Sequence, residues 1–235
     1  MSNRIMIGLL SISIFMVLSC SVFQPKYLPK EYVDNLKTSK KSGIIACVSD
    51  RNLDRTFEYG ENAFVSDTTH EWVQAGVNPK RVLYYMLRES TGYMFQECKD
   101  PNIYDIQIIP DITSARIERL NSSRKRTGDQ NEEIYGKEYS ANIGLNIKVI
   151  DKERNDILNI KKTVGSRAWG YGRVPPTCVS SNCWDWANEA SIENGSTNAV
   201  VKAIYDVLPT INDQISGHDS VMQLEKSTPK RIDKK

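Results

Sequence analysis

The sequence feature that most constrains the fold is a strict alternation of apolar and polar residues between positions 141 and 149. The apolar positions are Ala141, Ile143, Leu145, Ile147 and Val149. A period of two is that of a β-strand with one buried and one solvent-exposed face. Residues 151–156 are polar and predict a turn, after which Leu158, Ile160 and Val164 repeat the pattern. The sequence therefore predicts a long antiparallel hairpin over residues 141–164.

A β–α–β unit is predicted before this hairpin. Residues 43–48 form a short apolar run, rich in β-branched residues, that indicates a buried strand. Asn78 and Pro79 are favoured at the N-cap and first position of a helix, and Gly92 is typical of a helix end. Residues 93–98 then predict a second strand.

Three further segments are predicted to be irregular. Residues 104–120 predict a strand interrupted at Pro110, because a proline within a strand marks a sheet edge or a bulge. Residues 121–137 are nearly all polar and predict a mobile hairpin tip with solvated basic residues. The alternative is that Arg124, Lys125 and Arg126 contact anionic lipid or a partner. Residues 165–195 are rich in Gly, Pro and Trp and predict a long loop.

The last predicted element is a helix that begins at Ser196 and is kinked or ended by Pro209. Beyond it, the polar and lysine-rich residues 216–235 predict a disordered basic tail. The fold class is therefore α+β: a mixed four- to five-stranded sheet with two helices packed on one face, in a single domain over residues 43–215.

The first twenty residues predict an export signal. A charged start is followed by an apolar run from Ile5 to Leu18, and then by Ser19 and Cys20. A short apolar core before a small residue is typical of a cleaved signal peptide. The core is shorter than the roughly 20 apolar residues that span a membrane. Residues 1–19 are therefore predicted to be a signal peptide.

The end of this segment resembles the lipobox of bacterial lipoproteins, because Cys20 directly follows a small residue. The resemblance implies that Cys20 is acylated, becomes the first residue of the mature chain and holds it on a membrane. The alternative is an ordinary signal with a chance cysteine. Residues 20–42 would then be the lipidated N-terminus and a tether. In lipoproteins of enteric bacteria, an Asp directly after the acylated cysteine retains the protein in the inner membrane. This chain has Ser21 at that position, so the resemblance implies a location on the periplasmic face of the outer membrane.

Four further cysteines predict two disulfides, because an exported protein enters an oxidising compartment. Three pairings are open. Cys178 and Cys183 are close enough in sequence to pair locally, and Cys47 and Cys98 would form the second bridge if their strands are neighbours. A metal site is not expected, because the chain has only two histidines.

The candidate binding surface is aromatic. Trp169, Tyr171, Trp184 and Trp186 lie within eighteen residues of the predicted loop. Aromatic rings on a loop closed by a short disulfide would form a rigid contact surface. The alternative is that the rings fold back over the sheet as a lid.

Several function classes are not favoured by composition or motifs. A formal net charge of +2 is too balanced to indicate a nucleic-acid partner. The sequence has no nucleophile elbow, zinc-protease motif, phosphate-binding loop or dinucleotide-binding turn. A histidine base is available only at His70 or His218, and neither has an evident nucleophile. No catalytic residue, metal or cofactor is therefore predicted, and the chain is expected not to be an enzyme.

Behind a lipobox, this order of elements is similar to small α/β outer-membrane lipoproteins of Gram-negative bacteria. These include YajG-type lipoproteins, the lipopolysaccharide-assembly lipoprotein and the penicillin-binding-protein activators. The residues that carry the resemblance are Ile44–Val48, Asn78–Gly92, the 141–164 hairpin and Ala199–Leu208. It implies a binding or scaffolding component of an envelope assembly with an envelope protein as partner. The alternatives are a module that holds a glycan or lipid on the aromatic loop, and an envelope hydrolase.

Overall fold

The computed structural model describes residues 32, 35–36, 43–51, 78–127, 132–178 and 182–228. The predicted signal peptide, Cys20, His70 and most of the predicted tether lie outside these residues, so what was inferred about them stays a prediction.

Five strands form one mixed sheet in the order β2-β1-β3-β4-β5. They are β1 (Ile45–Val48), β2 (Met94–Phe95), β3 (Ile106–Thr127), β4 (Glu132–Asp151) and β5 (Asp156–Val174). Strand β1 is parallel to both β2 and β3, whereas β3, β4 and β5 are antiparallel. The predicted α+β class with a mixed sheet is confirmed.

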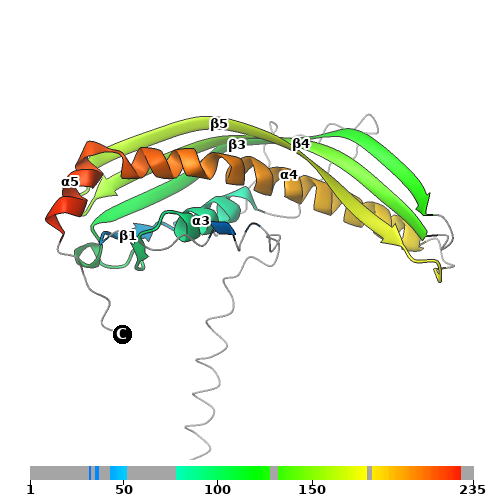
Figure 1. The fold of residues 1–235 in the computed structure, drawn as a ribbon, viewed down its shortest axis with the longest axis horizontal. Helices are drawn as coiled ribbons and strands as arrows, with labels where there is room; N and C mark the ends of the chain where they lie inside the picture. Colours follow the sequence, from blue (N-terminus) through cyan, green and yellow to red (C-terminus); the bar gives the residue numbers. More distant parts are fainter. Residues whose placement is uncertain are drawn as a thin grey trace, which may run out of the picture.

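Among the described residues from 43 onward, three α-helices accompany the sheet: α3 (Pro79–Ser90), α4 (Asn182–Ser216) and α5 (Asp219–Ser227). A short 3-10 helix, η1 (Pro101–Ile103), precedes β3. The three long strands arch lengthwise over α4, while α3, β1 and α5 gather at one end (Figure 1). We call that end proximal, and the opposite end, where β3 and β5 finish, distal. The inward-facing residues of β3 and β4 and the apolar residues of α3 and α4 share one core.

Helix α3 is built as the sequence predicts. The Asn78 side chain accepts a hydrogen bond from the backbone N–H of Lys80 at 2.9 Å, and Pro79 occupies the first turn. The helix ends before Gly92, whose φ of 74° lies in the left-handed region that a glycine adopts without strain. The chain then enters the short strand β2 beside β1, which completes the β–α–β unit.

The predicted hairpin is confirmed and is longer than its sequence signal. Strands β4 and β5 pair from Ile150↔Asp156 to Glu133↔Val174. The prediction of a mobile tip over 121–137 is wrong for residues 121–127 and 132–137, which are paired strand. Cross-strand ion pairs and the start of α4 hold these polar residues in the sheet, as described below.

Strand β3 shows the predicted irregularity. It pairs with β1 only through residues 106–108, so Pro110 lies where no second strand flanks β3 within the described part of the chain. The register also shifts between Ile112 and Ser114. Both features suit a strand containing a proline.

The C-terminal third differs most from the sequence prediction. Residues 165–174 continue β5, and α4 begins at Asn182, so the predicted 165–195 loop is wrong apart from the connection between them. The helix passes through both Ser196 and Pro209, neither of which begins or ends it. Where a disordered tail was predicted, α5 packs Val221 into the core at 1 % exposure.

Candidate functional site

Helix α4 meets the distal part of β5 backbone to backbone. A Cβ atom added to Gly172 would lie 1.8 Å from the Ala187 carbonyl oxygen, and one on Gly170 would lie 1.9 Å from the Gly195 nitrogen. Among the described glycines only Gly92 has a positive φ, so these positions need glycine for space rather than for backbone conformation. The close approach fixes the first turns of α4 beside the end of β5.

Two asparagines of α4 complete this contact. Asn194 and Asn198 donate their side-chain N–H groups to the backbone carbonyls of Tyr171 and Trp169, each at 3.2 Å. Strand β5 is last in the sheet order, so these carbonyls face away from β4 and lack a strand partner in the described structure. The helix therefore satisfies and covers the distal edge of the sheet.

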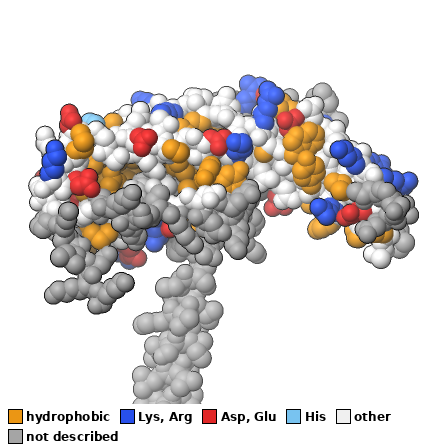
Figure 2. Space-filling model, in the orientation of Figure 1, with side chains coloured by type: hydrophobic (Ala, Val, Ile, Leu, Met, Phe, Trp, Pro, Cys, Tyr) orange, Lys and Arg blue, Asp and Glu red, His pale blue; other side chains and the backbone are white. Residues whose placement is uncertain are grey.

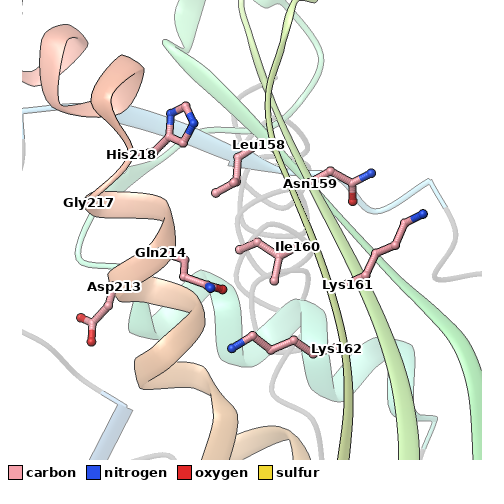
Figure 3. Close-up of a pocket in the computed structure, with 9 residues that line it drawn as sticks. All are labelled: Leu158, Asn159, Ile160, Lys161, Lys162, Asp213, Gln214, Gly217 and His218. Carbon is pink, nitrogen blue, oxygen red and sulfur yellow. The ribbon is translucent and has the colours of Figure 1, made fainter.

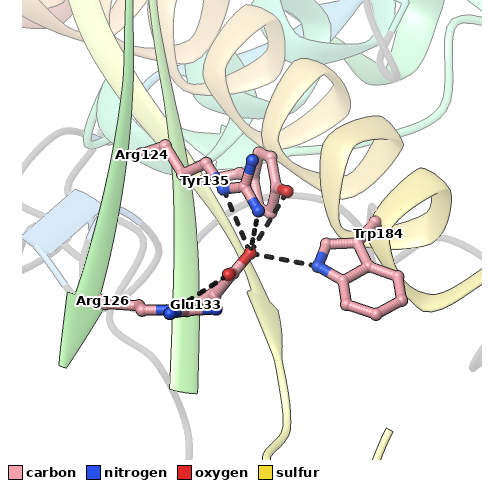
Figure 4. Close-up of polar contacts among 5 residues, drawn as sticks. All are labelled: Arg124, Arg126, Glu133, Tyr135 and Trp184. Carbon is pink, nitrogen blue, oxygen red and sulfur yellow. Dashed lines mark hydrogen bonds and ion pairs between the residues drawn. The ribbon is translucent and has the colours of Figure 1, made fainter. Parts of the chain in front are cut away.

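A buried carboxylate ties β3, β4 and α4 together at the same end (Figure 4). Glu133, whose side chain is 7 % exposed, accepts two hydrogen bonds from Arg124 at 2.6 and 3.0 Å. It accepts one each from Arg126 at 3.1 Å, the Trp184 indole N–H at 3.0 Å and the Tyr135 hydroxyl at 3.4 Å. These residues form the Glu133 cluster.

The electrostatics of the Glu133 cluster favour the charged carboxylate. The hydrogen bond from Arg124 is the main cause that lowers the pKa of Glu133, with smaller contributions from Trp184 and Arg126. The same hydrogen bond raises the pKa of Arg124, whose guanidinium also lies 5.2 Å from the centre of the Tyr135 ring. We therefore interpret the Glu133 cluster as a structural connection between β3, β4 and α4 rather than as a proton donor or acceptor in a reaction.

The four aromatic residues of the predicted binding surface divide into two groups. Tyr171 and Trp186, which are 53 % and 62 % exposed, line one hollow of about 510 Å³ between β5 and α4. Trp169 stacks on Tyr171 with ring centres 6.1 Å apart, and supports it from the strand. Trp184 instead binds Glu133. The rings stand on a strand and a helix, not on the predicted loop.

We call this space, lined by Tyr171, Arg173, Trp186, Glu189, Glu193 and their neighbours, the distal hollow. Tyr171 and Trp186 are the two most exposed large hydrophobic side chains of the described residues. Figure 2 shows basic side chains at this end of the molecule beside exposed hydrophobic ones. The hollow thus combines aromatic rings, two carboxylates and a guanidinium on a fixed frame.

Both cysteine pairs lie at disulfide distance. The Cα atoms of Cys47 and Cys98 are 5.2 Å apart and join β1 to the segment after β2. Those of Cys178 and Cys183 are 6.4 Å apart and close the passage from β5 into α4, next to the distal hollow. Of the three pairings left open by the sequence, this is the one favoured by the short spacing of Cys178 and Cys183 and by the neighbouring strands β1 and β2.

A second hollow, of about 410 Å³, lies at the proximal end between β5 and the end of α4 (Figure 3). Its lining includes His218, Lys162 and Asp213, but no nucleophilic hydroxyl or thiol. In Figure 3 the Asp213 carboxylate lies on the other side of α4 from Lys162 and His218. The hollow therefore does not assemble a catalytic constellation.

Two further searches cover only the described residues. They contain no group of three or more His, Cys, Asp or Glu side chains placed to hold a metal ion. None of their helices is both long and apolar enough to cross a membrane.

Sequence reasoning missed Glu133, Asn194, Asn198 and the two contact glycines. The available signal was the basic run Arg124-Lys125-Arg126 placed a short turn away from Glu132-Glu133. Opposite charges on both sides of a turn suit cross-strand pairing, but a charged run also suits a solvated loop.

Comparison with known proteins does not assign a family. No family model matches the sequence, and no curated protein matches it. A proposed neuraminyllactose-binding hemagglutinin homolog from Helicobacter pylori aligns at a TM-score of 0.34 and 11% identity, over 81% of this chain and 90% of that one. A proposed lipoprotein from Caulobacter crescentus aligns at 0.34 and 9% identity, over 62% and 87%. A minor lipoprotein from Acinetobacter baumannii aligns at 0.22 and 11% identity, over 77% and 93%. Likenesses this weak carry no argument about function.

Proposed function

We propose that the chain is a non-enzymatic lipoprotein of the Gram-negative envelope that binds another envelope component through its distal hollow. Acyl chains on Cys20 hold it on the periplasmic face of the outer membrane, and the partner is an envelope protein. The observation that carries the binding role is the exposure of Tyr171 and Trp186 on one hollow.

Large exposed aromatic rings on rigid elements are typical of binding surfaces. Aromatic residues contribute much of the binding energy at protein interfaces, and they lose little conformational entropy when they are held in place beforehand. Here the Gly172–Ala187 contact, the two asparagine hydrogen bonds and the Glu133 cluster all hold the strand and helix that carry the rings.

The placement of the N-terminal segment supports an extended arrangement. Tyr32 packs edge to face on Tyr205 of α4, with ring centres 4.8 Å apart, and Leu36 is buried in the core. Trp186 lies nineteen residues before Tyr205 in the same helix, or roughly 28 Å at 1.5 Å per residue. The sheet and α4 would thus present the distal hollow away from the point where the N-terminal segment meets the domain.

A glycan is the second candidate ligand for the same hollow. Its rim carries Arg173, Glu189, Glu193 and Asn194 beside the two rings. Apolar rings with a few placed hydrogen-bonding groups are the usual composition of small-ligand sites. Saturable quenching of tryptophan fluorescence by envelope glycans, lost in Trp186→Phe but retained in Trp184→Phe, would favour a glycan over a protein partner.

The anchor is tested on the full chain. We expect the mature wild-type protein to begin at an acylated Cys20 in its intact mass and to enter the outer-membrane fraction. Cys20→Ala should leave that fraction while keeping the same thermal unfolding midpoint, because the change removes the lipid anchor and none of the core contacts of the described residues. A mature N-terminus without lipid, or retention of Cys20→Ala in the outer-membrane fraction, would contradict the lipoprotein proposal.

A further inference from the structure

The two long edges of the sheet differ in how they are covered. At the β5 edge, Asn194 and Asn198 of α4 bind the strand carbonyls. Strand β3 forms the opposite long edge, because β1 pairs with it only through residues 106–108. Beyond Ile108, no second strand pairs with β3 among the described residues. The backbone N–H and C=O groups that point away from β4 therefore form an edge that another strand can extend.

One stretch of this edge has the regular geometry that such pairing needs. Proteins often protect a sheet edge with prolines or bulges. Pro110 lies before residues 114–119, and the register with β4 shifts on both sides of them. Residues 114–119 themselves are regular strand and contain neither proline nor glycine. We call them the β3 edge segment.

The two faces of the β3 edge segment differ in polarity. Ala115 and Ile117 are each 2 % exposed and belong to the core. Arg116 and Glu118 point to the opposite face, because successive side chains of a strand alternate. They form an ion pair within the strand, and the Arg116 side chain is 62 % exposed. The outer face thus carries one cation and one anion, two residues apart.

This spacing makes the segment complementary to a second copy of itself. In two antiparallel copies related by a two-fold axis perpendicular to the sheet, the buried faces coincide only if the axis passes through a residue. An axis at Ile117 places Arg116 of each copy opposite Glu118 of the other. An axis at Arg116 or at Glu118 would place like charges opposite each other, which destabilises paired strands. Charge complementarity therefore favours a second copy in this one register.

We propose that two copies of the chain join through their β3 edge segments into one continuous sheet, with Ile117 on the two-fold axis. The ion pair between Arg116 and Glu118 within each chain is exchanged for two ion pairs between the chains. In the sheet order β3 and β5 lie on opposite sides of β4, so this interface does not include the distal hollow. The inference does not depend on the proposed function.

The test combines charge reversal with mixing of the variants. The mature full chain is studied by sedimentation equilibrium in density-matched detergent, and we expect a monomer–dimer equilibrium for the wild type. Arg116→Glu and Glu118→Arg should each weaken dimerisation by about tenfold, because the attractive contacts across the axis become repulsive. An equimolar mixture of the two variants should recover the wild-type affinity or exceed it, because opposite charges again face each other in the mixed dimer. An ion pair that acts only within one chain cannot produce this recovery, because both variants have lost it.

Arg167→Glu is the matched control for the charge change. Arg167 is exposed on β5 and is opposite Ser140 of β4, which is in turn opposite Glu118, so it lies on the same face but away from the edge. This variant should sediment as the wild type does. A monomeric wild type, wild-type affinity in either single variant, an equal loss in the control, or no recovery in the mixture would overturn the proposal.

A second measurement tests the register without reversing any charge. Directly opposite residues of antiparallel strands have Cα atoms roughly 4.5–5.5 Å apart, which is within reach of a disulfide. A mixture of Arg116→Cys and Glu118→Cys chains should therefore form a covalent dimer on mild oxidation. Either variant alone should form about a tenth as much, because its new thiols are offset along the two strands. Equal crosslinking in the mixture and in the single variants would overturn the proposed pairing.

Discussion

The contact between α4 and β5 makes a sharp prediction for Gly172. In Gly172→Ala the new methyl group would lie 1.8 Å from the Ala187 carbonyl oxygen, which is backbone and cannot rotate away. Helix α4 must therefore move away from β5, and this would weaken the hydrogen bonds from Asn194 and Asn198 as well.

The magnitude follows from two opposing effects. Overpacking of this kind typically destabilises a protein by about 1–3 kcal/mol. Replacing a glycine in a strand by alanine also stabilises the protein by roughly 0.5–1 kcal/mol, because it reduces the conformational entropy of the unfolded chain. The two ranges differ by about 0–2.5 kcal/mol, and the closeness of this backbone contact places Gly172→Ala in the upper part, at a loss of about 1–2 kcal/mol of unfolding free energy.

Gly165→Ala is the matched control, because Gly165 lies seven residues earlier in the same strand. A Cβ atom there would lie 3.4 Å from the Ala141 carbonyl oxygen, an ordinary contact. This variant should be neutral or more stable by up to about 0.5–1 kcal/mol. Urea unfolding followed by tryptophan fluorescence measures both. Equal midpoints for the two variants would refute the argument that α4 rests directly on the backbone of β5.

Three further predictions concern the cluster, one disulfide and the last helix. The hydrogen bond from Arg124 lowers the pKa of Glu133 below its ordinary 4.5, so the charged carboxylate stabilises the fold above that pH and this stabilisation is lost as pH falls through the lowered value. Glu133→Gln should therefore reduce the drop in unfolding midpoint between pH 7 and pH 3. An unchanged pH profile would contradict this. The double change Cys47→Ser with Cys98→Ser opens a loop closed over a sequence separation of 51 and should cost up to about 4 kcal/mol in chemical unfolding, whereas no change under non-reducing conditions would exclude the bridge. Val221→Ala should cost about 1–2 kcal/mol if α5 is docked, and nothing if residues beyond 216 are a free tail.

The central hairpin is predictable because its two faces differ in polarity. Residues 141–149 bury one face on the core and expose the other, so the apolar residues recur with a period of two. At the distal end this contrast disappears. The face that meets α4 carries Gly170, Gly172 and Glu133 between its few large buried residues, so the paired strands resemble loops in sequence.

The same glycine contact explains why the sequence gives no clear signal for the start of α4. A helix that packs on a strand through Gly195 and Ala187 does not need a broad apolar stripe, so the first turns of α4 lack the usual signal. The sequence of residues 182–195 is therefore typical of a loop, and it predicts a continuation of the preceding loop instead of a helix. The tail prediction failed for a related reason, because α5 buries Val221 with little other apolar surface.

The residue types indicated which aromatic side chains lie at one end of the molecule, but not which secondary-structure elements carry them. Trp169, Tyr171, Trp184 and Trp186 do meet at one end of the molecule, because β5 and α4 are antiparallel neighbours joined by a short connection closed by Cys178 and Cys183. Which rings are exposed depends on the alternation of β5 and on Glu133, a partner about fifty residues away in sequence. No local pattern contains that information.

The most direct test of the central claim is site-specific photo-crosslinking from the distal hollow. In the organism that carries this protein, position 186 of the full chain is replaced by p-benzoylphenylalanine, with position 163 as the control. Thr163 is exposed on β5 but is not part of the distal hollow.

We predict a discrete adduct with an envelope component from position 186, none from position 163, and loss of the adduct when Tyr171→Ala is added. No adduct from position 186, or the same adducts from both positions, would contradict the proposal that the distal hollow is the binding surface.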